Sequence, residues 1–131
     1  MATKGTPFGG RDEIAERAYV NGADFSLVCY TNTPNSLTDS AVVATLVQPV
    51  VANGYAPIVL NGTWSVVNGI LTYVHSTPTF PTWTATGTWS ATVNGVAMIY
   101  GSRVIHFKDL VTPFVAANGR KLQIDMNTVF A

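Results

Sequence analysis

The chain has 131 residues, a length that fits one domain with one hydrophobic core. Its hydrophobic fraction of 47% is ordinary for a folded domain, whereas its charged fraction of 11% is less than half of the usual value of about 25%. Seven basic and seven acidic residues give a formal net charge of zero, which argues against a nucleic-acid partner. No stretch approaches the roughly 18 consecutive apolar residues of a membrane span, and no apolar signal segment is seen, so we expect no membrane association.

The first ten residues contain three glycines and Pro7, and they predict a flexible N-terminal arm in front of a single domain over residues 11–131. Residues 11–20 predict the one helix of the chain, because small and apolar side chains recur there at helical spacing. Glu13 precedes Arg17 by four residues, which is the favourable order for an ion pair on a helix.

After residue 24 the apolar pattern changes to a period of two, which is typical of β-strands. We expect strands over residues 25–30, 41–47, 55–60, 63–67, 70–75, 83–94, 96–100, 103–108 and 121–127. Pro57 restricts the third of these to an edge or bulged position. Six Asn-Gly pairs favour tight hairpin turns, and they start at residues 21, 53, 61, 68, 94 and 118. The first of these pairs is expected to end the helix instead.

Two segments alternate strictly between apolar and polar residues. Residues 83–94 place Trp83 and Trp89 on one face, and residues 121–127 place Leu122 and Ile124 on one face. We expect these faces to point into the core. The sequence thus predicts an all-β chain, a single antiparallel β-sandwich or jelly-roll-like domain with one short N-terminal helix.

Charge is distributed unevenly along the chain. The 63 positions of residues 40–102 contain no Asp, Glu, Lys or Arg. One interpretation is a solvent-facing surface that is rich in hydroxyl groups. The other is a surface covered by partner subunits, since interface cores are depleted of charged residues. Both interpretations remain open from the sequence.

Residues with catalytic or metal-binding chemistry are few and scattered. Cys29 is the one cysteine and lies in an apolar run, so a buried structural thiol is expected. His75 and His106 are the two histidines, and no carboxylate lies in residues 40–108 to complete a metal site with them. We therefore expect no catalytic residues, no metal, no cofactor and no enzyme activity.

Surface aromatic residues could in principle stack on sugar rings, as in a carbohydrate-binding module. The candidates are Trp64, Tyr73, Phe80, Trp83 and Trp89. For Trp83 and Trp89 we expect core packing instead, because they share the apolar face of an alternating segment.

The order of motifs resembles small virion structural proteins of tailed bacteriophages. The resemblance rests on a short N-terminal helix, the run Phe25-Ser26-Leu27-Val28-Cys29-Tyr30, Tyr55-Ala56-Pro57, the Thr86-Gly87-Thr88-Trp89 strand, an apolar strand ending at Tyr100 and the turn at Asn118-Gly119. It spans the chain from about residue 11 onward. Arg120 departs from the acidic residue that is common after this turn in such proteins.

This resemblance implies a β-sandwich component of a virion, assembled in the host cytoplasm. We expect a capsid decoration (cement) protein that binds major capsid subunits or other virion proteins, as a homo-oligomer for which a trimer is favoured. The alternatives are a tail, baseplate or fibre component that contacts the host surface, and a carbohydrate-binding β-sandwich module. The expected assembly contacts are Lys4, Phe8, Arg11, Phe80, Thr84, Thr86 and Thr88.

Overall fold

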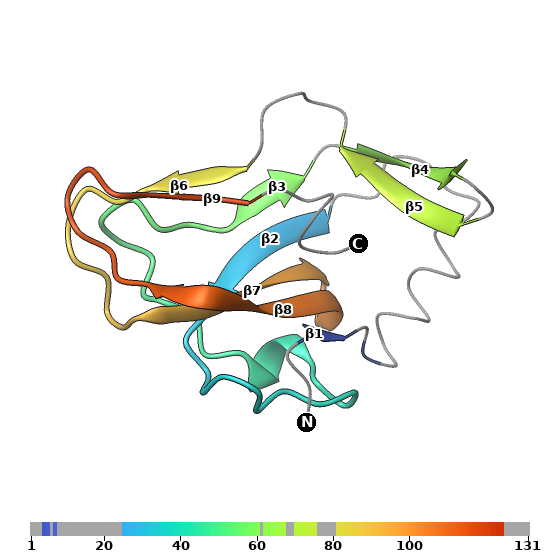
Figure 1. Cartoon of the computed structure of the whole chain (residues 1–131), viewed down its shortest axis with the longest axis horizontal. Helices are drawn as coiled ribbons and strands as arrows, with labels where there is room; N and C mark the ends of the chain where they lie inside the picture. The colour runs from blue at the N-terminus through green and yellow to red at the C-terminus, as the bar shows by residue number, and fades with distance from the viewer. Residues whose placement is uncertain are drawn as a thin grey trace.

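The computed structural model describes residues 4, 5, 7, 25–60, 62–67, 70–75 and 81–124, with the backbone alone for residue 4 and for residues 62–67 and 70–75. The expected helix over residues 11–20 and most of the expected arm lie outside these residues. Within them the regular secondary structure is almost entirely antiparallel β-strand (Figure 1). The elements are β1 (Lys4–Gly5), β2 (Phe25–Tyr30), the 3-10 helix η1 (Val43–Thr45), β3 (Ile58–Leu60), β4 (Gly62–Val67), β5 (Ile70–His75), β6 (Thr82–Thr84), β7 (Val93–Tyr100), β8 (Arg103–Phe114) and β9 (Lys121–Gln123).

Five of these strands form a central sheet in the order β1-β8-β7-β2-β3. β3 is an edge strand, as the proline at position 57 predicts. β4 pairs with β5 as a hairpin around Asn68-Gly69, and its register ends on the pair Val67 and Ile70, so the clearest hairpin of the sequence is confirmed. β6 pairs with β9, two strands that are almost forty residues apart in the chain.

The central sheet is buried on both faces, and β2 shows this most clearly. Five of its six residues are buried. Since successive side chains of a strand point to opposite faces, both faces of the sheet must be covered at β2. Leu27 and Cys29 belong to one core, whereas Val28 and Tyr30 belong to another. The sequence-based expectation of an interior strand here is confirmed.

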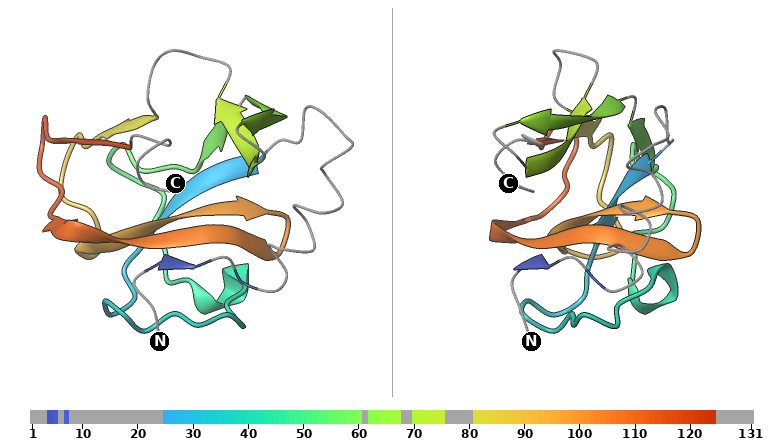
Figure 2. Two further views of the ribbon diagram at one scale, coloured as in Figure 1. Left: turned by 45° about the vertical axis from the view of Figure 1, so that its right-hand side comes forward. Right: turned by 90° about the vertical axis from the view of Figure 1, so that its right-hand side faces the viewer.

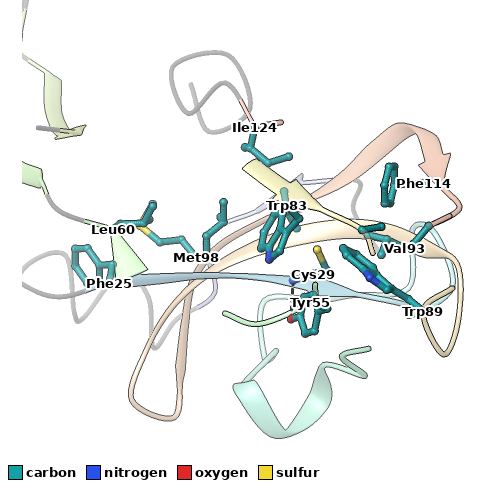
Figure 3. Close-up of a cluster of buried hydrophobic side chains, with 14 of the residues drawn as sticks. Phe25, Cys29, Tyr55, Leu60, Trp83, Trp89, Val93, Met98, Phe114 and Ile124 are labelled. Atoms are coloured by element: carbon teal, nitrogen blue, oxygen red, sulfur yellow. Dashed lines mark hydrogen bonds between the residues drawn. The ribbon is translucent and has the colours of Figure 1, made fainter. Parts of the chain in front are cut away.

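The larger core lies between the central sheet and the two-stranded sheet of β6 and β9 (Figure 3). Four aromatic rings pack in series through it. Tyr55 stacks on Trp83 with ring centroids 6.1 Å apart and meets Trp89 edge-on at 5.2 Å, and Trp89 lies 5.5 Å from Phe114. Trp89 and Ile124 are 5% and 2% exposed, so the inward direction expected from the alternation is confirmed for both.

The smaller core lies on the opposite face of the sheet. The segment of residues 31–47, which includes η1, crosses this face (Figure 2). It contributes Leu37 and Leu46, which pack with Val104 and Phe107 of β8. Asn32 holds this segment in place, since its side chain accepts a hydrogen bond from the Val47 N–H at 2.8 Å and donates one to the Thr45 carbonyl.

One buried carboxylate, that of Asp109 in β8, joins this cover to strands β2 and β8 of the sheet. The Tyr30 hydroxyl donates to Asp109 Oδ1 at 2.6 Å, and the Asn35 N–H donates to Asp109 Oδ2 at 2.6 Å. Between the strands of Tyr30 and Asp109 lies Gly95, where an added Cβ would stand 2.0 Å from Tyr30 Cζ. The glycine is therefore required, since the tyrosine ring crosses directly over its Cα to reach the carboxylate.

The role of Asn94-Gly95 corrects the sequence-based expectation, because this pair lies inside β7 rather than in a turn. The Asn94 side chain donates to the carbonyls of Thr31 and Asn32, and Gly95 makes room for Tyr30. Both contacts join residues that are more than sixty positions apart, so no local pattern shows them.

Several expected strands also differ from those observed. The strand expected over residues 55–60 is shortened to β3, which starts at Ile58, and the one expected over residues 103–108 extends to Phe114. The expected strand over residues 41–47 is wrong, since the chain forms the 3-10 turn η1 there, in which the Val42 carbonyl accepts from the Thr45 N–H and the Val43 carbonyl accepts from the Leu46 N–H. The expected strand over residues 83–94 is divided. β6 ends at Thr84, a loop follows, and β7 begins at Val93, although the alternation of burial continues to Ser90.

Three buried groups that lose a proton at alkaline pH should make the stability of the fold depend on pH. Burial raises the pKa of Cys29, of Tyr30 and of Tyr55, and the Asp109 carboxylate adds to the effect on Tyr30. In the unfolded chain these groups ionise near their ordinary values of about 8.5 for cysteine and about 10 for tyrosine. A raised folded pKa means that stability is complete below those values and falls as the pH rises above them.

We expect the free energy of unfolding to fall above pH 10 by about 1.4 kcal/mol per pH unit for each of the three groups. Urea unfolding between pH 7 and 11 measures this slope. Tyr30→Phe and Tyr55→Phe each remove one ionisable group, so each should make this slope shallower by about 1.4 kcal/mol per pH unit. An alkaline slope that both substitutions leave unchanged would contradict the assignment.

Candidate assembly surface

Two segments of the uncharged part of the chain lie side by side at one end of the molecule. The first is residues 47–54, and the second is residues 84–90, which contains the end of β6 and the loop after it. The Val50 N–H donates to Ser90 Oγ at 3.0 Å, and the Thr86 N–H donates to the Asn53 carbonyl at 2.9 Å. The two segments are thus joined by hydrogen bonds at both ends of their contact.

Asn53 is the centre of this contact. Its carbonyl also accepts from Trp89 Nε1 at 2.8 Å, and its side-chain Nδ2 donates to the Thr88 carbonyl at 2.9 Å. Together with the bond from the Thr86 N–H to the Asn53 carbonyl, these two bonds make three hydrogen bonds at Asn53. We call the three bonds the Asn53 clamp. Because Trp89 is part of the larger core, the clamp fixes the two surface segments to the interior of the domain.

The backbone of the clamp depends on the Asn-Gly pair. Asn53 and Gly54 have φ angles of 53° and 89°, the left-handed values that a type I′ turn requires. A Cβ at Gly54 would lie 2.2 Å from the Thr84 carbonyl oxygen, so only glycine allows the turn to approach β6 this closely. The turn expected from the sequence at this pair is confirmed.

The two segments present apolar and hydroxyl side chains to the outside. Val47, Val50 and Val51 are 58%, 65% and 68% exposed, which is high for valines on a rigid element. We call the following set the valine–threonine surface: Val47, Val50, Val51, Thr84, Thr86, Thr88 and Ser90, all of them exposed. No member carries a charge.

Charged side chains lie at one border of this surface. Lys121 on β9 is the strand partner of Thr84, and the Arg120 carbonyl accepts from the Ala85 N–H. The Arg120 guanidinium turns toward β8, where it lies 5.2 Å from the centre of the Phe114 ring and donates to the Val115 carbonyl at 2.7 Å. The surface is therefore apolar and neutral in its middle, with cations at its border.

The structure brings together three of the seven residues expected to make assembly contacts. Thr84, Thr86 and Thr88 lie on the valine–threonine surface, and all three are exposed. Lys4 lies elsewhere, in β1 at the far edge of the central sheet. Phe8, Arg11 and Phe80 lie outside the described residues.

The exposed valines are the part of this surface that sequence reasoning missed. The apolar pattern predicts a strand over residues 41–47 and does not mark Val50 and Val51 as surface residues. The usable signal was Pro49, which is buried and cannot donate to a strand ladder. In this segment Leu46 and Pro49 point inward, whereas Val47, Val50 and Val51 point outward.

Further valines are exposed away from this surface. Val59 lies on the edge strand β3, and Val111 is 96% exposed in a bulge of β8. The bulge arises because residues 110–113 have no strand partner between the pairs Gly95–Asp109 and Val93–Phe114. Val42 and Val115 are also more than one third exposed.

The described residues contain no cluster of three or more His, Cys, Asp or Glu side chains that could bind a metal ion. His106 is half-buried in β8, as expected for a strand histidine, and Cys29 is a buried free thiol. Trp83 and Trp89 are buried, as expected for core residues, so neither offers a face to a sugar ring. Among the described residues, no helix has the length and hydrophobicity that crossing a bilayer requires.

Comparison of the chain with models of protein families, with curated proteins and with solved structures found no match.

The Asn53 clamp yields a prediction about stability. Asn53→Ala removes the side-chain bond to Thr88 and places alanine, which tolerates a positive φ less well than asparagine, at a φ of 53°, so we expect a loss of about 2 kcal/mol. Asn53→Gly keeps the backbone conformation and loses only the side-chain bond, so we expect about 1 kcal/mol. Urea unfolding measures both.

Asn118→Ala is the matched control, because Asn118 is also an exposed asparagine before a glycine but does not have a positive φ. It should change the free energy of unfolding by less than about 0.5 kcal/mol. Equal effects of the Ala substitutions at positions 53 and 118 would contradict the role assigned to the clamp.

Proposed function

We propose that this protein is a bacteriophage virion structural protein, and that it acts as a capsid decoration protein which binds major capsid subunits through its valine–threonine surface. The observation that carries the proposal is the neutral, rigid and partly apolar character of that surface. The sequence resemblance to small virion proteins of tailed bacteriophages supports the same role.

The chemistry of the surface suits a permanent protein contact better than contact with water. Exposed charges are the least costly side chains to leave in water, yet this surface has none. The cores of protein interfaces are depleted of Lys, Glu and Asp for the opposite reason, since a charge buried there must be desolvated. A valine or threonine side chain carries no charge, so its burial in an interface has no cost of charge desolvation.

The rigidity of the surface also supports assembly. Side chains and loops that become ordered on binding reduce the affinity, so a surface that is already fixed binds more tightly for the same area. Here the Asn53 clamp and the buried Trp89 ring fix both segments before any partner arrives. The zero net charge further reduces electrostatic repulsion between copies on a crowded shell.

We also propose the finer architecture of a β-sandwich. The central sheet would be one layer, and the pairs β6–β9 and β4–β5 would be the other. Two observations support this. Trp83 and Leu122, from β6 and β9, pack against the larger core on one face of the central sheet, and β4–β5 lies on the same side of that sheet in both views of Figure 2.

Binding of the purified protein to expanded heads that lack it tests the proposed function. A decoration protein should co-sediment with such heads and raise the temperature at which they break open. Recovery of the protein with isolated tails, and not with heads, would contradict the proposal in favour of a tail or baseplate component. Binding to glycans by the isolated domain, without binding to heads, would favour a carbohydrate-binding module.

Charged substitutions test whether the valine–threonine surface makes the contact. Val50→Lys and Thr86→Lys each place an unpaired cation in the proposed interface, so we expect about 2 kcal/mol of lost binding energy at each, or roughly a thirtyfold weaker affinity for heads. Ser102→Lys is the control, since Ser102 is exposed in the β7–β8 turn at the opposite end of the sheet. Wild-type affinity of the two surface variants, with their folds intact, would rule out this surface.

A further inference from the structure

The N-terminal strand occupies a defined site on the edge of the central sheet. β1 pairs with β8 in an antiparallel register that places Lys4 opposite Lys108 and Gly5 opposite Phe107. β1 is only two residues long, whereas β8 has twelve. A short segment near the start of the chain thus adds a strand to the edge of a much longer one.

The site is shaped for a residue without a side chain. A Cβ at Gly5 would lie 3.0 Å from Phe107 Cζ and 3.1 Å from Phe107 Cε1, with Asp39 Oδ1 at 3.8 Å. Phe107 is 1% exposed, and Pro7 is buried as well. The backbone at Gly5 therefore lies directly on an aromatic ring of the smaller core.

The rest of this edge of β8 is limited on both sides. Near its start, Val42 forms a bridge with Arg103, and the Val43 N–H donates to the Ser102 carbonyl. Near its end, residues 110–113 bulge out of the ladder. The stretch around Phe107 and Lys108 is thus a short docking site for one extended strand, with a neighbour on each side.

We propose that this site exchanges strands between copies, so that β1 of one copy pairs with β8 of a second copy in the register seen within one chain. Exchange of an identical element is a low-cost route to association, because every contact made between copies is already made within one. Backbone pairing supplies the affinity, and the contact of Gly5 with Phe107 supplies the specificity. This inference does not depend on the proposed role in a capsid.

The balance between the two states depends on concentration. Nineteen positions, 6–24, separate β1 from β2 in the sequence, and for two segments joined by a connection of such length the effective concentration is on the order of 1 mM. Pairing within one chain therefore dominates in dilute solution. Pairing of β1 with β8 of a second copy becomes as frequent as pairing within one chain when the protein concentration approaches this value. Neighbouring copies in an ordered assembly reach such concentrations.

Cysteine cross-linking between different copies tests the exchange. A copy with Lys4→Cys is mixed with a copy that carries Lys108→Cys, and the initial rate of heterodimer formation under mild oxidation is followed on non-reducing gels. At roughly 1 mM protein we expect the heterodimer to be the main cross-linked product, and its fraction should fall by roughly two orders of magnitude at about 10 µM. Cys29 is buried and stays unreactive in this assay.

Two variants make the result specific. Lys121→Cys in place of Lys108→Cys is the matched control, since Lys121 is an exposed strand lysine on β9, away from β1. Adding Gly5→Val to the Lys4→Cys copy should reduce heterodimer formation to the level of this control, with circular dichroism confirming that the variant is folded. A Lys4–Lys108 heterodimer rate no higher than the control, together with ready cross-linking in the Lys4→Cys/Lys108→Cys double variant, would overturn the proposal, because it would show pairing within one chain only.

Discussion

The Asn53 clamp is the contact on which the outer surface of this protein depends. A single asparagine accepts hydrogen bonds from the Thr86 N–H and from Trp89 Nε1, and it donates one to the Thr88 carbonyl. Without it, the Val50–Ser90 bond would be the remaining described hydrogen bond between residues 47–54 and the loop after β6. With it, they form one surface that is fixed to the aromatic core, and valines that belong to no strand are held outward beside the threonines.

On the opposite face of the central sheet, the hydrogen bonds that join distant segments are made to a charged side chain, that of Asp109. Asp109 is the one buried charged side chain among the described residues, and Tyr30 and Asn35 both donate to it. A buried carboxylate with these partners ties the covering segment of residues 31–47 to strands β2 and β8. The protein thus keeps one carboxylate inside with two hydrogen-bond donors, while its valine–threonine surface has no charge.

Local patterns in the sequence predict most strands and the direction of their side chains. The period of two places Trp89 and Ile124 inward, the Asn-Gly pair at position 53 marks a real turn, and the strands expected on either side of position 68 pair as β4 and β5. The failures share a cause, since each depends on a contact between distant residues. Asn94-Gly95 looks like a turn until the Tyr30 ring, from another strand, occupies the space above Gly95. Residues 41–47 look like a strand, but the Val43 N–H donates to the distant Ser102 carbonyl and the chain turns at this point instead. The surface itself could be predicted only in part, because the threonines follow from alternation, whereas their position beside Val50 follows from the clamp.

Amide hydrogen exchange tests most directly whether the valine–threonine surface is covered by a partner. Exchange is compared by mass spectrometry between the free protein and the protein bound to expanded heads. Peptides that contain residues 47–54 and 84–90 should exchange more slowly in the bound state, whereas the β7–β8 turn at residues 101–102 should exchange at the same rate in both states. Unchanged exchange at residues 47–54 and 84–90 in a fully bound sample would contradict the account.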